Sequence, residues 1–503
     1  MPAQDELLNE GEPVSSGSPQ LDYILKGGYA ANRVHLIEGE PGAGKTTLGL
    51  QFLLEGAAKD ERCLYITLSE SKDELLHVAR THDWDLGRIE IFELVPPELS
   101  LDTDREQSIV YASDLELGET VQMVMDEVER IAPARIVFDS LSEIRLLAQG
   151  PLRFRRQVLA LKHYFAKHNC TVLFLDDLTQ NEDDLSLHSL AHGVVRLEQV
   201  TQNYGAERRR LRVFKMRGRA FRGGFHDFCI RKGGVAIFPR LVAAAYPEHG
   251  DEERMAASGV EQLDRLVGGG LDYGTTSLLI GPSGSGKSTL ALKYLHAGLS
   301  AGERALVISF DETERVFMRR ASGLGMDVTP FLQSGLLTLR QVDPAELSPG
   351  ELAAAVRDEV DGGARIVVLD SLSGYQHAMP EEQFMLLQMH ELVTFLNQQG
   401  VLTFLILAQS GMVGQMQSPV DITYLSDTVL LLRFFEARGE IKRALSVLKK
   451  RTGRHESTIR ELKIDADGIR VGEKLEGFRG VLTGTPTYEG DGALLEERIV
   501  DRG

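Results

Sequence analysis

The segment Gly39-Glu40-Pro41-Gly42-Ala43-Gly44-Lys45-Thr46 has a second copy in the chain, Gly281-Pro282-Ser283-Gly284-Ser285-Gly286-Lys287-Ser288. Both segments fit G-x-x-x-x-G-K-[ST], a loop whose backbone N–H groups surround phosphate oxygens. Each copy lies between an apolar run typical of a strand and a run typical of a helix. For a single copy the alternative is a chance glycine-rich turn, but two copies in the same context favour two P-loops.

The P-loop pattern assigns roles to individual residues. Glycines accept backbone dihedrals that are closed to other residues, which allows the loop to wrap around a triphosphate. We expect the two lysines to bind the β- and γ-phosphates and the residue after each lysine to ligate Mg²⁺, so the predicted ligands are ATP and Mg²⁺. The predicted ATP-binding residues are Gly39, Gly42, Gly44, Lys45, Thr46, Thr47, Gly281, Gly284, Gly286, Lys287, Ser288 and Thr289.

The similarity between the two halves extends beyond the P-loops. Residues 16–22 (Ser-Gly-Ser-Pro-Gln-Leu-Asp) recur as residues 258–264 (Ser-Gly-Val-Glu-Gln-Leu-Asp), at the same interval that separates the two P-loops. The interval then shortens, because the first half carries extra residues in a polar, acidic stretch, 96–114, which we interpret as a loop. A repeat this long indicates two tandem domains, which we place at residues 1–247 and 248–503.

Each half alternates apolar, strand-like runs with helix-like runs. This pattern predicts an α/β fold in which a mostly parallel sheet is covered by helices on both faces. Late in each half, two neighbouring runs indicate a hairpin of antiparallel strands. These runs are 193–197 with 211–215 and 428–433 with 444–449.

Composition limits the classes of function. The chain has 503 residues, a formal net charge of −19 and an ordinary 43% of hydrophobic residues. The acidic balance argues against a general DNA or membrane binder, because phosphate-rich surfaces attract basic faces. No apolar run is long enough to cross a membrane, and the three cysteines lack metal-ligand spacing, so we expect a cytoplasmic protein.

An aspartate ends a buried strand-like run in each half. Asp139 follows Ile-Val-Phe, and Asp370 follows Val-Val-Leu. P-loop ATPases use an aspartate at this place, called Walker B, as the second protein ligand of Mg²⁺. The alternative is that each aspartate caps the helix that follows. The predicted metal ligands are therefore Thr46 with Asp139 and Ser288 with Asp370.

Hydrolysis also needs a group that positions or deprotonates water. In many P-loop folds this group lies at the tip of the strand after the P-loop helix, where the two halves carry Glu70 and Glu312. Asp311 adds a second carboxylate in the second half, whereas Ser69 occupies that place in the first half. The alternative is that these acids only stabilise the start of the next helix.

Basic residues cluster late in each half. Lys215 and Arg217 fall in the first cluster, and Lys449 and Arg451 fall in the second. One interpretation is an arginine finger that a subunit supplies to its neighbour's γ-phosphate. The others are a nucleic-acid patch and a solvated turn.

With these motifs the sequence resembles the KaiC family of circadian clock ATPases and kinases. The resemblance covers residues 16–486, nearly the whole chain. It rests on the following segments: Ser-Gly-x-x-x-Leu-Asp (16–22 and 258–264), Lys-Met-Arg-Gly (215–218), Gly-Gly-Gly (268–270), Ser-Asp-Thr-Val-Leu-Leu-Leu (426–432), Glu-Ala-Arg-Gly-Glu (436–440) and Phe-Arg-Gly-Val-Leu-Thr-Gly-Thr-Pro (478–486).

The resemblance implies hexameric double rings of RecA-like domains with ATP bound between subunits. It implies that the four cations named above reach the neighbour's nucleotide in trans, and that a regulatory protein similar to KaiB is a partner. The family transfers phosphate to an adjacent Ser-Thr pair, which aligns here with Thr423 and Tyr424. The candidate acceptors are therefore Thr423 and the flanking Ser418 and Ser426, while we expect Tyr424 to be a packing residue.

We therefore interpret the chain as a tandem RecA-like ATPase that forms a homo-hexamer, carries a Ser/Thr autokinase in its second half and acts in signalling, timing or stress adaptation. Two alternatives remain open. One is a DNA-dependent ATPase similar to RecA or RadA, which salt-dependent DNA binding would favour. The other is a nucleotide-gated scaffold with little turnover, which a turnover assay distinguishes from an enzyme.

Overall fold

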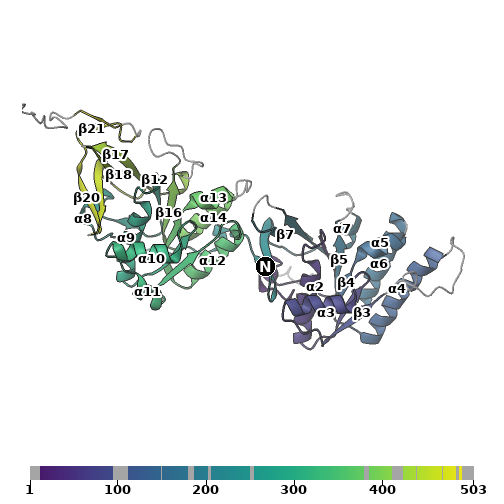
Figure 1. Ribbon diagram of the computed structural model, residues 1–503. Helices are drawn as coiled ribbons and strands as arrows, with labels where there is room; N and C mark the ends of the chain where they lie inside the picture. The colour runs from purple at the N-terminus through teal and green to yellow at the C-terminus, as the bar shows by residue number, and fades with distance from the viewer. Residues whose placement is uncertain are drawn as a thin grey trace, which may run out of the picture. The chain divides into compact units, whose positions relative to one another are not determined.

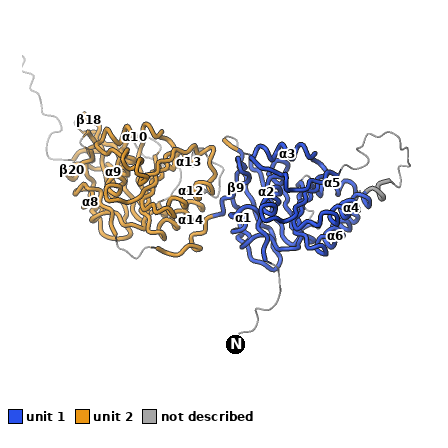
Figure 2. Tube along the Cα trace, turned by 90° about the horizontal axis from the view of Figure 1, so that it is seen from below, with its two compact units in different colours: residues 1–203, 207–240 blue, residues 204–206, 241–503 orange. Residues whose placement is uncertain are grey.

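The chain forms two compact units, residues 1–203 with 207–240 and residues 204–206 with 241–503 (Figure 2). The boundary expected at residues 247 and 248 stays a prediction. The computed structural model describes residues 12–94, 112–148, 150–178, 186–201, 205–249, 254–378, 385–409, 423–437, 439–466, 468–482 and 486–489.

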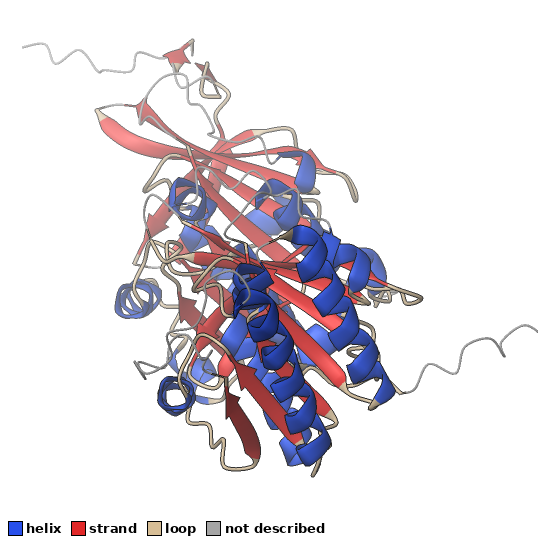
Figure 3. Ribbon diagram, turned by 90° about the vertical axis from the view of Figure 1, so that its right-hand side faces the viewer, coloured by secondary structure: helices blue, strands red, loops and turns tan. Residues whose placement is uncertain are grey.

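Each unit is built on a nine-stranded sheet with helices packed along it (Figures 1 and 3). The strand order is β3-β2-β4-β5-β1-β6-β7-β8-β9 in the first unit and β14-β13-β15-β16-β12-β17-β18-β19-β20 in the second. Neighbouring strands are parallel from β3 to β6 and from β14 to β17, and the remaining pairs are antiparallel. The predicted α/β class with mostly parallel sheets is confirmed.

The first unit alternates strands and helices as the sequence predicts, and the hairpin expected late in this half is formed by β6 and β7. Its strands are β1 (Val34–Gly39), β2 (Cys63–Thr67), β3 (Ile89–Glu93), β4 (Arg135–Asp139), β5 (Thr171–Asp177), β6 (Gly193–Val200), β7 (Arg208–Met216), β8 (Phe225–Arg231) and β9 (Gly234–Phe238). Its helices are α1 (Pro19–Ile24), α2 (Lys45–Ala58), α3 (Lys72–Thr81), α4 (Ala112–Ile131), α5 (Leu141–Ala148), α6 (Pro151–Lys167) and α7 (Ser186–Leu190).

The second unit repeats this series of elements. Its strands are β10 (Met255–Ala256), β11 (Leu271–Asp272), β12 (Thr276–Gly281), β13 (Arg304–Ser309), β14 (Leu337–Gln341), β15 (Ala364–Asp370), β16 (Leu402–Ala408), β17 (Thr428–Ala437), β18 (Glu440–Lys450), β19 (Ile459–Asp465), β20 (Gly468–Lys474), β21 (Phe478–Arg479) and β22 (Thr487–Tyr488). Its helices are α8 (Glu261–Leu266), α9 (Lys287–Ser300), α10 (Glu314–Gly323), α11 (Thr329–Gln333), α12 (Pro349–Asp361), α13 (Leu372–Ala378) and α14 (Met385–Gln398), with short 3₁₀ turns η1 (Ala243–Ala245) and η2 (Thr423–Leu425).

The apolar strands are buried on both faces of each sheet. In β1, Leu36 packs with residues of α4, α5 and α6, whereas Ile37 packs with residues of α1, α2 and α3. Successive strand side chains point to opposite faces, so one continuous apolar run supplies both cores. This double burial places β1 and its counterpart β12 in the middle of their sheets, with a P-loop at the carboxyl end of each.

The repeated segment that leads into α1 and α8 forms the same internal hydrogen bond in both units. The backbone N–H of Ser16 donates to Asp22 Oδ1 at 2.8 Å, and that of Ser258 donates to Asp264 Oδ1 at 2.7 Å. One expectation needs correction: Ala112 to Asp114, assigned to a loop, form the first residues of α4. The rest of that stretch, 96–111, lies outside the described residues.

Candidate nucleotide-binding sites

Each P-loop leads directly into a helix through a glycine whose backbone conformation other residues rarely adopt. Gly44 has φ of 100° and Gly286 has φ of 104°, in the left-handed region. A Cβ atom on either glycine would also collide with Ile230 or Ile464. The lysine that follows each glycine is therefore the first helical residue, at a helix N-terminus suited to anions.

The P-loop lysines fold back over their own loops. Lys45 Nζ donates to the carbonyl oxygens of Gly39 and Glu40, both at 2.9 Å. Lys287 Nζ donates to the carbonyl oxygens of Gly281 at 2.9 Å and Pro282 at 2.7 Å. Both ammonium groups are thus held close to the predicted phosphate position.

The two lysines differ in their charged partners. Lys45 Nζ forms an ion pair with Asp177 Oδ1 at 2.7 Å, a partner that the sequence analysis missed. Gly281 pairs with Ala408 as Gly39 pairs with Asp177, so the second half has alanine at this place. Burial lowers the pKa of Lys287 to about 8.

The predicted metal ligands lie together in both halves. Thr46 Oγ1 donates to Asp139 Oδ2 at 3.3 Å, and the hydroxyl of Tyr65 donates to the same oxygen at 2.6 Å. In the second half Ser288 and Asp370 line the same cavity. Each aspartate precedes a cis peptide bond.

These residues fit a Mg²⁺ ion. Burial raises the pKa of both Asp139 and Asp370 even though the P-loop lysine of each half opposes that shift, and a bound cation would favour the charged carboxylates further. Carboxylate and hydroxyl oxygens are the protein ligands that Mg²⁺ prefers. Groups of three or more acidic, histidine or cysteine ligands do not occur among the described residues, so phosphate oxygens and water would complete the coordination.

Glu70, the predicted water-activating group of the first half, follows strand β2 closely. Its backbone is anchored to Thr67, because the Glu70 N–H donates to Thr67 Oγ1 at 3.0 Å while Thr67 Oγ1 donates to the Glu70 carbonyl at 2.7 Å. The side-chain oxygen Oε2 is buried and has no hydrogen-bond partner. Burial, followed by the nearby Asp139 carboxylate, raises the pKa of Glu70 to about 7, which is near the ideal value for a general base at neutral pH.

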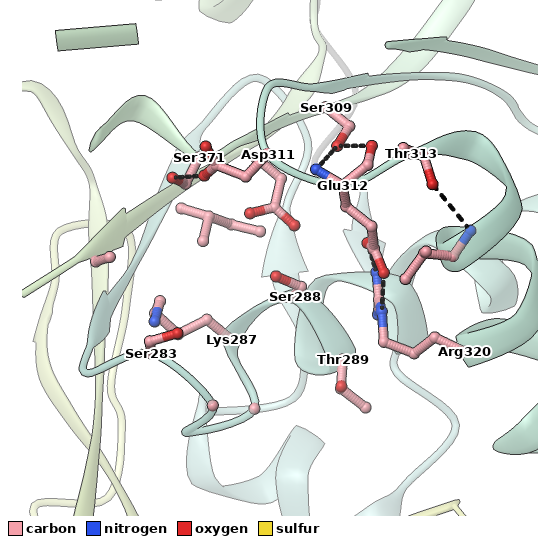
Figure 4. Close-up of a pocket in the computed structure, with 16 residues that line it drawn as sticks. Ser283, Lys287, Ser288, Thr289, Ser309, Asp311, Glu312, Thr313, Arg320 and Ser371 are labelled. Carbon is pink, nitrogen blue, oxygen red and sulfur yellow. Dashed lines mark hydrogen bonds and ion pairs between the residues drawn. The ribbon is translucent and has the colours of Figure 1, made fainter. Parts of the chain in front are cut away.

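Glu312 has the same backbone anchor but a different side-chain environment (Figure 4). Ser309 takes the place of Thr67, with hydrogen bonds of 2.8 and 3.1 Å to the Glu312 backbone. The carboxylate is paired with Arg320, while Asp311 Oδ2 accepts from the hydroxyl of Ser371 at 2.6 Å.

A cavity of about 570 Å³ joins these groups in the second half (Figure 4), a size that suits a small-molecule ligand. Gly281 is absent from its lining, although its carbonyl holds Lys287. The sequence-predicted residues that line the cavity are Gly284, Gly286, Lys287, Ser288, Thr289, Asp311, Glu312 and Asp370.

The basic residues of the first half lie away from their own P-loop. Gly39 pairs with Leu197 of β6, and Leu197 pairs with Leu211 of β7, so Leu211 is level with the P-loop. Lys215 pairs with Val194 and is thereby level with Leu36 of β1, three residues or about 10 Å from the P-loop end of that strand at 3.3 Å per residue. Arg217 follows beyond the end of the strand. Neither cation is therefore brought to its own phosphate site.

The carbonyl groups beside these cations hold them in place. Lys215 Nζ donates to the carbonyl oxygens of His188 and of Ala191, the latter at 3.0 Å. Arg217 donates to the carbonyl oxygen of Ser189. The helix α7 and the residue after it thus present both cations as a fixed pair.

The second half repeats this arrangement with the candidate phosphoacceptor segment. Lys449 Nζ donates to the carbonyl oxygens of Thr423 at 3.1 Å and Ser426 at 2.6 Å. Arg451 donates to Asp427 Oδ1 at 3.3 Å and to the Tyr424 carbonyl at 3.1 Å.

The candidate acceptors differ in accessibility. Thr423 is exposed, whereas Ser426 is 0% exposed and its Oγ lacks a hydrogen-bond partner. Tyr424 is 52% exposed, so the expectation that it packs inside the chain is wrong. Its ring points outward because the next residue, Leu425, fills the core position. Ser418 lies outside the described residues.

Three residues of these sites were missed by sequence reasoning. Asp177 is an acid at the end of a strand, which is a signal, but the sequence does not fix that this strand, β5, lies beside β1. Arg320 lies in helix α10, eight residues after Glu312, which precedes that helix. This spacing indicates that the two side chains are close only when the direction of the helix is known. Tyr65 sits in an apolar strand and gave no signal.

Two P-loops at the centres of two mostly parallel sheets, each with an aspartate at the carboxyl end of a parallel strand that one further strand separates from the P-loop strand, define a protein with tandem RecA-like nucleotide-binding domains. A family model described as the KaiC ATPase matches residues 14–242 and, a second time, residues 256–476. The chain therefore belongs to the KaiC family and is a KaiC-like ATP-binding protein.

Curated relatives match over almost their full length. The circadian clock protein KaiC3 of Synechocystis sp. is 26% identical over 495 residues, which cover 96% of each chain. The circadian clock oscillator protein KaiC of Parathermosynechococcus lividus is 27% identical over 482 residues, covering 94% of this chain and 87% of the relative. Among the described helices, none combines the length and the apolar composition that crossing a bilayer requires.

Proposed function

We propose that the chain is a Mg²⁺-dependent ATPase with one site in each half. The observation that carries this proposal is the repeated set of four groups, a P-loop lysine, the hydroxyl after it, a Walker B aspartate and a strand-tip glutamate. The set occurs once around Lys45 and once around Lys287. A helix cap or a chance turn would not require all four groups in both halves.

The chemistry follows from the roles of these groups. The lysine and the bound Mg²⁺ offset charge on the triphosphate, and Mg²⁺ stabilises the charge that develops as the terminal phosphate departs. Glu70, with its raised pKa, takes the proton from the attacking water in the first half. Water oxygen then forms the new bond to the γ-phosphorus as the bond to ADP breaks.

We also propose that each site is completed by a neighbouring subunit of a homo-hexameric double ring. Lys215 and Arg217 lie towards the opposite end of the sheet from their own P-loop, and Lys449 and Arg451 do the same in the second half. Hydrogen bonds to carbonyl groups fix the two lysines without neutralising them. A neighbour's phosphate is the ligand that such fixed cations fit.

The test of the ATPase is the replacement of each P-loop lysine by methionine, which keeps length and removes charge. Lys45→Met should abolish nucleotide binding in the first half, and Lys287→Met in the second. The double variant should show no ATP turnover. Parent-like turnover in a folded double variant would refute the assignment and leave the nucleotide-gated scaffold as the better account.

A second candidate function, autophosphorylation, is favoured by the position of Thr423. Its carbonyl is bound by Lys449, so the acceptor segment lies beside a cation proposed to reach the neighbour's γ-phosphate. The transfer would form a bond from Thr423 Oγ1 to the γ-phosphorus, release ADP and pass the hydroxyl proton to a carboxylate such as Asp311 or Glu312. Ser426 is a poorer acceptor because its hydroxyl is buried.

Peptide mapping after incubation with Mg-ATP tests this candidate. Phosphate on Thr423 that disappears in Glu312→Gln supports the kinase. An unmodified peptide around Thr423 from an ATPase-active sample excludes it. The recombinase alternative predicts ATP turnover that DNA stimulates, which the same preparation can show.

The family relationship and the acidic composition also guide the wider proposal. We place the protein in the cytoplasm, in signalling, timing or stress adaptation, with a regulatory partner similar to KaiB. Native mass spectrometry with and without ATP and candidate partners tests both the hexamer and the partner.

A further inference from the structure

The two halves hold the same glutamate backbone but treat its side chain differently. In the second half Arg320 Nε donates to Glu312 Oε1 at 3.1 Å, and Arg320 Nη2 donates to Oε2 at 2.7 Å. The pair is mostly shielded from solvent, with 22% of the Arg320 side chain and 20% of the Glu312 side chain exposed. Both oxygens of the proposed base are thus engaged by a permanently charged group.

The guanidinium of Arg320 is fixed on its helix. It lies over the ring of Phe317, at 5.2 Å from the ring centre, and Phe317 is itself buried in the core. The remaining nitrogen, Nη1, is buried and has no hydrogen-bond partner. Arg320 therefore directs its paired donors at Glu312 rather than dividing them among several acceptors (Figure 4).

Among the described residues of the first half, Glu70 has no arginine partner of this kind. Val78 occupies the helical position of α3 that corresponds to Arg320 in α10, and Leu75 corresponds to Phe317. One Glu70 oxygen, Oε2, is accordingly buried without a hydrogen bond. The two sites differ at the group that must accept a proton from water.

The bidentate pair with Arg320 fixes the plane of the Glu312 carboxylate, so the carboxylate can turn towards an attacking water only by giving up one of these bonds, although each oxygen keeps a second lone pair. Charge-assisted, bidentate pairs are the stronger class of hydrogen bond, so this release opposes the reaction. We propose that Arg320 is a positioning residue that restrains Glu312 and makes the second half a slower ATP hydrolase than the first half. This inference rests on the proposed ATPase function.

Swapping the two residues between the halves tests the inference in the full-length protein. Arg320→Val is made in a Lys45→Met background, where only the second half binds ATP. Val78→Arg is made in a Lys287→Met background, where only the first half binds ATP. Arg319→Val, at the exposed neighbouring position of the same helix, is the matched control, and Arg320→Gln serves if the valine variant is unstable to heat.

Steady-state hydrolysis and binding of a fluorescent ATP analogue are measured for each variant. We expect Arg320→Val to raise kcat of the second half about 10-fold, the change in rate for 1.36 kcal/mol of barrier, with little change in KM. Val78→Arg should lower kcat of the first half by a similar factor, and Arg319→Val should change neither constant. A residue that only stabilises the fold would not give opposite changes in kcat at constant KM.

The outcomes separate this inference from the function on which it rests. An unchanged or lower kcat in Arg320→Val, or an unaffected first half in Val78→Arg, overturns the restraint while the ATPase stands. Nucleotide binding without turnover in both the Lys45→Met and Lys287→Met parents overturns the ATPase itself, and the inference with it.

Discussion

Replacing Asp177 by asparagine should increase the affinity of the first half for ATP. In the free chain Lys45 Nζ lies 2.7 Å from Asp177 Oδ1, and the two side chains are 8% and 30% exposed. The lysine must exchange this carboxylate for a phosphate, and the carboxylate also repels the phosphate that replaces it. Asparagine preserves the shape of the side chain and removes both penalties.

The size of the effect follows from the burial of the pair. Hydrogen bonds to charged groups are worth about 1.5–3 kcal/mol, and exposed ion pairs about 0.2–1 kcal/mol. The partly exposed Asp177 falls between these cases, so we expect a gain of about 1–2 kcal/mol, or roughly 5–30-fold in affinity. The gain should be confined to the first half, because alanine stands at this place in the second half.

The assay is titration of a fluorescent ATP analogue with Asp177→Asn in the Lys287→Met background, where the first half alone binds. Ala408→Asp in the Lys45→Met background is the reciprocal variant and should weaken binding by a similar factor. Unchanged or weaker binding by Asp177→Asn would refute the reasoning and indicate that Asp177 assists the bound nucleotide.

Two further predictions follow from buried charged groups. The pKa of Glu70 is raised to about 7, so its basic form is lost as pH falls through that value. We therefore expect kcat/KM of the first half to drop below pH 7. The variant Glu70→Gln should lack this decrease in its pH profile. Arg135 is 1% exposed and donates to the carbonyl oxygens of Ser15 at 2.8 Å and Phe52 at 2.9 Å. Chemical denaturation should therefore show that Arg135→Ala lowers the free energy of unfolding of the first unit by roughly 3–5 kcal/mol. The control Arg88→Ala removes the exposed ion pair between Arg88 and Asp60 and should lower it by less than about 1 kcal/mol.

The fold could be predicted from the sequence because its signals are local. Apolar runs such as the strand before each P-loop are buried along their whole length, and the glycines that end the loops accept the left-handed backbone conformation that the entry into each helix requires. Because the second half repeats the pattern of the first half, most helices and strands were indicated by two separate segments of the sequence. The polar, acidic composition of residues 96–114 indicated a loop, although the last three of these residues begin α4.

The site could be predicted only where a motif fixes the role of a residue. The lysines, hydroxyls and aspartates belong to such motifs. Asp177 and Arg320 depend on strand order and helix orientation, which place residues distant in sequence within hydrogen-bond reach of Lys45 and Glu312. The orientation of Tyr424 depended on which of two adjacent residues fills the core, and Leu425 does so.

The central claim, that ATP is hydrolysed at sites shared between subunits, is tested most directly by mixing two inactive variants. One chain carries Lys45→Met and Lys287→Met and keeps its cations, and the other carries Arg217→Ala and Arg451→Ala and keeps its P-loops. The account predicts that neither is active alone and that turnover returns in mixed oligomers, because intact P-loops then meet intact cations. Mixed oligomers seen by native mass spectrometry without any recovery of turnover would contradict it.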